Sequence, residues 1–136
     1  MTTRRSRVRP VARQGAPRLL EKAGEFYESM REAVRAGRWN TAGLTAIHCA
    51  ISACDAVLVY YTEQRSASTD HQEVVYLLAS LEKVPDVKQK AETLRKILHQ
   101  KHLVEYEDRP LTANEAAELA KLTERFYHWA QHLVSP

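Results

Sequence analysis

The chain has 136 residues, of which 44% are apolar and 27% charged, and its formal net charge is +3 at pH 7. This length supplies one core large enough to fold without disulfides and leaves little room for a second domain. Only 4 Gly and 5 Pro interrupt the chain, and no segment alternates between apolar and polar residues as a half-buried strand does, so we expect an all-α protein.

The first 16 residues form an arginine-rich segment whose composition differs from that of the rest of the chain. Residues 1–18 contain six arginines and no acid, whereas residues 19–136 carry a net charge of −3. The lack of periodicity predicts a disordered tail over residues 1–16, followed by one helical domain over residues 17–136. The tail is either a solvated segment or an arm that binds nucleic acid through phosphate contacts. The arginines available for such contacts are Arg4, Arg5, Arg7, Arg9 and Arg13.

Two long helices are expected next. Apolar residues at three-to-four spacing predict a helix over residues 17–36, with Pro17 in its first turn and Gly37 at its end. The second helix should cover residues 40–64, and 15 of the 20 residues from 42 to 61 are apolar, which is typical of a central helix. We expect no membrane span there, because the segment is rich in alanine and carries Asp55 near its middle.

A polar link over residues 65–69 leads to a third, short helix that ends before Pro85. Thr69 or Asp70 should cap it, with Gln72 or Glu73 completing a capping box. The fourth helix is predicted over residues 86–101 or slightly beyond, and residues 105–111 should be irregular.

The last helix has the clearest start, because Thr112 and Glu115 have the spacing of a capping box. An apolar stripe along this helix should face the core, and it consists of Leu119, Leu122, Phe126, Trp129 and Leu133. Short links join antiparallel neighbours, so the predicted fold is a single up-and-down bundle of about five helices.

The residue types that bind metals and cofactors occur without a recognised pattern. His99 and His102 have helical ligand spacing, but no His-Glu-x-x-His motif or Cys/His knuckle is present, so we expect no metal and no cofactor. Cys49 and Cys54 are five residues apart on one helix, on different sides of it, so we expect neither a disulfide nor a metal site. Free cysteines and the lack of a signal-peptide core predict a cytoplasmic protein.

His48 and Asp55 lie seven residues apart on one face of the most apolar helix. A carboxylate there must be paired or hydrogen-bonded, because burying an isolated charge is costly. The two residues belong either to a structural network that fixes the helix register or to a binding pocket with shifted pKa values.

Four segments together resemble the HEPN superfamily of small helical bundles, which is widespread in prokaryotic defence and toxin–antitoxin systems. They are FYESMREAVRAGRWNTAGLTAIHCAISACDA, DHQEVVYLL, LRKILHQKHLVEYED and ERFYHWA, in that order. The likeness extends over about residues 20–134 and is strongest to compact members with an A-x-H-x-A-I second helix. It implies a HEPN-like bundle that forms a homodimer through its early and late helices.

Catalytic members of this superfamily are metal-independent ribonucleases that have four to six residues between an arginine and a histidine. Arg95 and His102 fit the loose spacing, with six residues between them. Lys96, however, stands where the family usually has Asn, Asp or His. The resemblance therefore allows a toxin-like endoribonuclease that uses Arg95 and His102 as its catalytic residues.

A second local likeness favours a different function. The run from Lys101 to Tyr106 resembles the basic-x-x-x-acidic-Tyr corner of HEPN members that lack nuclease residues. This resemblance implies a non-catalytic interaction module that engages RNA, a nucleotide or a cognate protein in a defence or stress system. We take the module as the leading hypothesis and the ribonuclease as its alternative.

Overall fold

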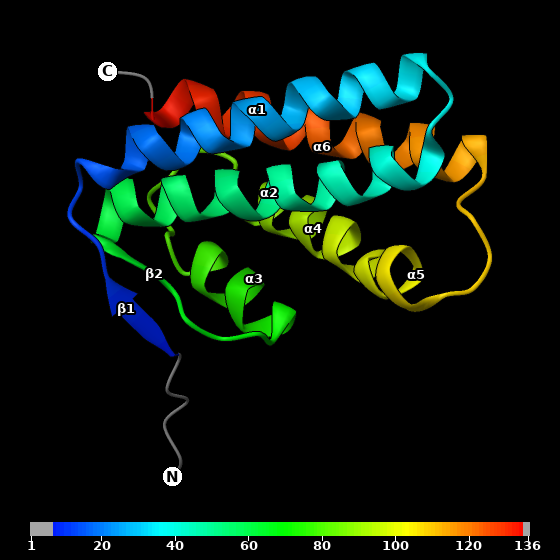
Figure 1. Ribbon diagram of the computed structural model, residues 1–136. Helices are drawn as coiled ribbons and strands as arrows, with labels where there is room; N and C mark the ends of the chain where they lie inside the picture. The colour runs from blue at the N-terminus through cyan, green and yellow to red at the C-terminus, as the bar shows by residue number, and fades with distance from the viewer. Residues whose placement is uncertain (1–6, 135–136) are drawn as a thin grey trace, which may run out of the picture.

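The computed structural model describes residues 7–134, and within them the chain forms six α-helices and one pair of very short strands (Figure 1). The all-α class is confirmed. The predicted fourth helix is divided in two at Gln100. In chain order the elements are β1 (Val8–Pro10), α1 (Gly15–Arg35), α2 (Trp39–Thr62), β2 (Gln64–Ser66), α3 (His71–Ala79), α4 (Val87–His99), α5 (Lys101–Tyr106) and α6 (Ala113–Val134).

The helix α2 is the centre of the molecule. It packs along α1 and α6 on one side, while α3, α4 and α5 lie against its other side (Figure 1). Its apolar composition and length would suffice to cross a membrane, but 78% of its most apolar window is buried inside the fold. The near-continuous apolar sequence of α2 is therefore explained by its contacts with helices on both sides.

A residue with a positive φ angle lies just outside each end of α2. Gly37 (φ 72°) makes the turn from α1, a conformation that costs glycine little. Glu63 (φ 54°) ends α2 in the left-handed conformation. The helix therefore stops before the predicted end at residue 64, and the chain reverses directly into β2.

The prediction of disorder over residues 1–16 is wrong for the part that the structure describes. β1 pairs antiparallel with β2, with Val8 opposite Ser66, and α1 begins at Gly15 rather than at Pro17. Two backbone hydrogen bonds extend this contact, from Val11 to Glu63 and from Ala67 to Arg7. The pairing is possible because the α1–α2 hairpin brings residues 8–10 beside residues 64–66. Arg4 and Arg5 lie outside the described residues.

Asp70 caps α3 as predicted, its carboxylate accepting the backbone N–H of Gln72 at 2.9 Å. The carboxylate of Glu73 accepts the backbone N–H of Arg7 at 2.6 Å, which ties the start of β1 to α3. The N-terminal segment is thereby fixed to two elements, β2 and α3.

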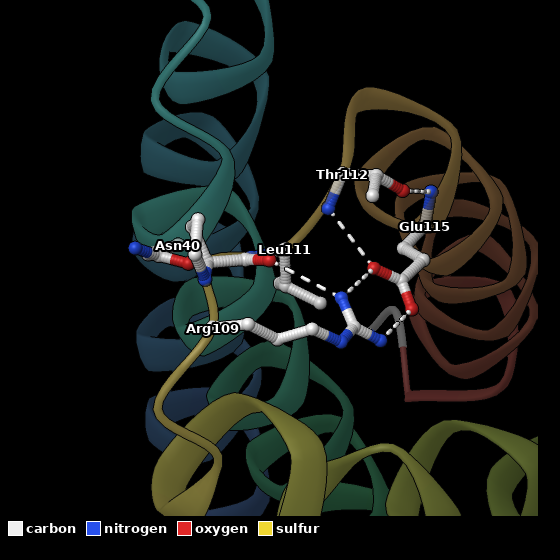
Figure 2. Close-up of polar contacts among 6 residues, drawn as sticks. Asn40, Arg109, Leu111, Thr112 and Glu115 are labelled. Carbon is white, nitrogen blue, oxygen red and sulfur yellow. Dashed lines mark hydrogen bonds and ion pairs between the residues drawn. The ribbon is translucent and has the colours of Figure 1, made fainter.

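The predicted capping box at the start of α6 is confirmed (Figure 2). Thr112 Oγ1 accepts the backbone N–H of Glu115 at 3.1 Å, and the Glu115 carboxylate accepts that of Thr112 at 2.9 Å. Arg109 donates to both oxygens of this carboxylate, and Asn40 Oδ1 accepts the backbone N–H of Leu111 at 2.9 Å. These contacts fix the loop between α5 and α6 to the start of α2.

The apolar stripe of α6 faces the core in part. Leu119 and Phe126 are buried, whereas Leu122, Trp129 and Leu133 are half-buried at its edge. Trp129 lies close to the surface, and its Nε1 donates to the carbonyl oxygen of Pro85 at 3.0 Å. The centre of the buried face also includes Ala116, Thr123, Tyr127, Ala130 and Val134.

Candidate functional site

A groove of about 950 Å³ in the described surface is lined by residues of α3, α4 and α5 and by the residues just before α3. Its volume lies near the upper end of the range of ligand-binding clefts, about 300–1,000 Å³. Leu98 is a buried apolar residue of its wall. The groove is otherwise rich in residues that bind phosphate or stack on rings, namely His71, Tyr76, Arg95, His99, Lys101, His102 and Tyr106.

The break between α4 and α5 lies among three groove residues that are close together in the chain. Lys101 begins a new helix directly after Gln100, the residue that caps the end of α4. His99, Lys101 and His102 all line the groove as a result. The charge of Lys101 also acts on His71, so the first residue of α5 lies close to the first residue of α3.

Arg95 and Lys101 are the two cationic residues of the groove, and each has a carboxylate beside it. Arg95 Nε donates to both oxygens of Glu92, at 3.1 and 2.9 Å, and this bonding raises the pKa of Arg95 above its ordinary value. Lys101 Nζ lies 3.7 Å from Glu105 Oε2. A phosphate group would therefore have to share each cation with its carboxylate neighbour.

The three groove histidines have different surroundings. Burial and the charge of Lys101 lower the pKa of His71 below its ordinary value of 6.5, although Glu105 and Asp70 oppose this shift. His71 therefore loses its proton more readily than an ordinary histidine. His102 is on the outer edge, with 75% of its side chain exposed and its Nε2 atom 4.0 Å from Glu107.

Tyr106 lies beside His102, with the ring centroids 5.4 Å apart and the planes tilted by 38°. Tyr106 is 69% exposed, and Tyr76 from α3 is 47% exposed. Both are groove residues. The groove thus combines one guanidinium group and one ammonium group with aromatic surface that is open to solvent.

Residues 16–133 match the family model of the HEPN domain. The chain belongs to the HEPN family. No curated protein matches it. Family membership confirms the resemblance inferred from the sequence and suggests a nucleotide-related or ribonuclease-like module.

Four of the residues predicted for function meet in this groove of the HEPN domain. They are Arg95 and His102, predicted from the ribonuclease pattern, and Lys101 and Tyr106, predicted from the corner before the last helix. His71 and Tyr76 were missed because they lie on another helix. The sequence did hold an indication that Tyr76 is exposed, because this aromatic residue lies off the apolar stripe of a short amphipathic helix.

The other predicted pair, His48 and Asp55, is not among the groove residues. The Asp55 carboxylate is buried and lies 3.0 Å from the guanidinium of Arg65 in β2. Burial raises the pKa of Asp55 to about 6, although the charge of Arg65 opposes the shift. His48 instead stacks on Phe26 of α1, with 5.3 Å between ring centroids. In the HEPN domain these contacts connect neighbouring elements.

The described arginines near the N-terminus also lie apart from the groove lining. Arg7 and Arg9 are exposed in and beside β1, and the guanidinium of Arg13 lies 5.8 Å from the ring centroid of Tyr60. Within residues 7–134 no group of three His, Cys, Asp or Glu side chains is placed to hold a metal ion. The groove offers guanidinium, ammonium, imidazole and phenol groups, together with the carboxylate of Asp70.

Proposed function

We propose that the protein is a HEPN-type binding module whose groove holds single-stranded RNA. The observation that carries this proposal is the meeting of Arg95, Lys101 and Tyr106 in one cleft with three histidines. A guanidinium offers paired donors to phosphate oxygens, and an exposed aromatic ring offers a face to a base. In this proposal the module acts in the cytoplasm, in a defence or stress system.

The charge of the groove predicts modest affinity. Only two of its lining residues carry a full positive charge, Asp70 carries a negative one, and Glu92 and Glu105 lie beside the cations. We therefore expect about two phosphate contacts. The logarithm of the association constant should fall with the logarithm of the salt concentration, with a slope of about −1.4 for a single strand.

Fluorescence anisotropy with a labelled RNA of about 12 nucleotides, within the usual range of single-strand site sizes, tests the proposal. Arg95→Ala should weaken binding about tenfold, equivalent to about 1.4 kcal/mol, and should make the salt slope shallower. Arg125→Ala is the matched control, because Arg125 is an exposed arginine of α6 outside the groove lining. Equal affinities for the two variants, or no RNA binding by the wild type, would contradict the proposal.

The alternative function is a metal-independent endoribonuclease. The observation in its favour is that Arg95 and His102 line one groove together with His71, an imidazole whose pKa is lowered by burial. An imidazole can accept the proton of a ribose 2′-hydroxyl, and a guanidinium can stabilise the charge that develops on the phosphate. The carboxylate of Glu92 would have to release Arg95 for this chemistry.

Cleavage of a single-stranded RNA pool in the presence of EDTA separates the two functions, since EDTA silences contaminating metal-dependent nucleases. The enzyme requires cleavage by the wild type that His102→Ala abolishes and His132→Ala retains. His132 is an exposed histidine of α6 that does not line the groove. Binding without cleavage is the result that the module predicts.

A homodimer is part of the same proposal, with α1 and α6 as the contact faces. Light scattering at several concentrations measures it. The exposed large apolar side chains found among residues 7–134 are Leu44, Tyr61, Tyr76 and Tyr106, on α2, α3 and α5. An α1–α6 interface would therefore be more polar than a typical obligate one. If the protein is a monomer at all concentrations, the dimer is wrong. The proposed RNA-binding groove does not depend on it, because the residues of one chain form the groove.

A further inference from the structure

We infer that Tyr76 and Tyr106 are stacking sites for unpaired nucleobases, so that the groove selects single strands over duplexes. This inference rests on the proposed RNA-binding function and adds the feature of the ligand that is recognised. Large rings this exposed keep apolar surface in contact with water in the free protein. They lie on α3 and α5, whose residues line the same groove.

The ring of Tyr106 already has a neighbouring ring before any ligand binds. It lies against His102. Its helix, α5, is fixed to α2 through Val104, which closely approaches Gly43. A side chain that already has such a contact loses less conformational freedom when a base stacks on it than one without any contact.

Because carboxylates lie beside the cations of the groove, the rings of Tyr76 and Tyr106 are important for the affinity for RNA. Arg95 and Lys101 are each shared with a carboxylate, so phosphate contacts alone give weak binding that depends little on sequence or strandedness. Stacking on an aromatic residue adds substantially to the affinity for a single strand. The bases of a duplex are stacked on one another and present no free face, so only a single strand gains from the tyrosines.

The test compares affinities for a single-stranded RNA and for a duplex of the same length. Tyr106→Ala should weaken binding of the single strand about tenfold and leave duplex binding unchanged, while Tyr106→Phe should keep the wild-type preference. Tyr61→Ala is the matched control, because Tyr61 is an exposed tyrosine outside the groove lining. Tyr76→Ala combined with Tyr106→Ala should lose more than either change alone. Thermal melts establish that each variant is folded.

The results separate this inference from the function on which it rests. If Arg95→Ala weakens RNA binding and Tyr106→Ala does not, the stacking sites are wrong while the RNA-binding function stands. Equal wild-type affinity for single strand and duplex also overturns the inference. If the wild type binds neither RNA, both proposals fail and a peptide becomes the candidate ligand for the groove.

Discussion

Arg109 donates to both carboxylate oxygens of Glu115, at 2.8 and 2.7 Å. The same carboxylate accepts the backbone N–H of Thr112 (Figure 2). The bonds from Arg109 and then from Thr112 lower the pKa of Glu115 from its usual 4.5 to about 2. One side chain therefore fixes the start of α6 and the loop that leads into it.

Acid should weaken this contact over a defined range of pH. Because the folded-state pKa of Glu115 is depressed, its stabilising effect is complete above about pH 4.5 and is lost as the pH falls towards 2. We expect the Tm of the wild type to fall more steeply than that of Glu115→Gln over this range, measured by circular dichroism. Glu118→Gln, an exposed change on the same helix, should behave as the wild type. Identical slopes for the wild type and Glu115→Gln would show that the contact contributes nothing.

The buried pair Asp55–Arg65 should give the opposite dependence on pH. Burial raises the pKa of Asp55 to about 6 from its usual 3.8. The folded state therefore binds this proton more readily than the unfolded state, and the contribution of Asp55 to stability decreases as the pH rises from about 4 to about 6.

Removing Arg65 tests this prediction. Arg65→Met should lower the free energy of unfolding at pH 8 by about 2–3 kcal/mol, below the range for a fully buried pair because Arg65 is only half-buried. The loss should be smaller at pH 5, where Asp55 is largely protonated. Urea denaturation at both pH values measures it, with Arg125→Met as the control. A loss that is the same at the two pH values would rule out the ion pair as its cause.

Gly43 provides the space for α5 and for the loop before α6. A methyl group there would overlap with Leu111 Cδ1 and would lie 3.1 Å from Val104 Cγ2. Gly43→Ala should therefore destabilise the fold by about 1–3 kcal/mol and, on the proposed function, weaken RNA binding by displacing α5. In a double-mutant cycle, Leu111→Ala should relieve part of the cost, so that the double variant is more stable than the sum of the single effects predicts. Simple additivity would exclude the clash.

Phe126 and Trp129 should differ in their contribution to the core. Phe126 is fully buried, whereas Trp129 is half-buried and bonded to the Pro85 carbonyl. Phe126→Ala should cost about 3–5 kcal/mol, and Trp129→Ala should cost less, about 2–3 kcal/mol. Urea midpoints of the two variants measure the difference. The reverse order would place the centre of the α6 contact at Trp129.

Local patterns predicted most of the helices because their signals act within one or two turns. The Thr112–Glu115 box is complete within four residues, and the apolar spacing of α1 needs no distant partner. The pairing of β1 with β2 could not be read in the same way. Each strand has three residues without apolar alternation, and their pairing follows only from the α1–α2 hairpin.

Several residues of the groove could be predicted from the sequence, but their meeting in one groove could not. Arg95, His102 and Tyr106 carry recognisable spacing along one stretch of chain. Their neighbours His71 and Tyr76 come from α3, which is brought beside them only by the packing of α3 on α4. The ion-pair partner of Asp55 could not be predicted either, because Arg65 lies in a segment that the sequence indicates only to be polar.

The two-stranded sheet also determines how the fold responds to force. β1 and β2 are antiparallel, and Val8 lies opposite Ser66. Tension applied to Arg7 therefore acts on this three-residue strand pair and on the hydrogen bond from Arg7 to Glu73 before it reaches α1. We expect an unfolding motor that pulls on this end to detach β1 at low force before it meets the resistance of the α1–α2 hairpin.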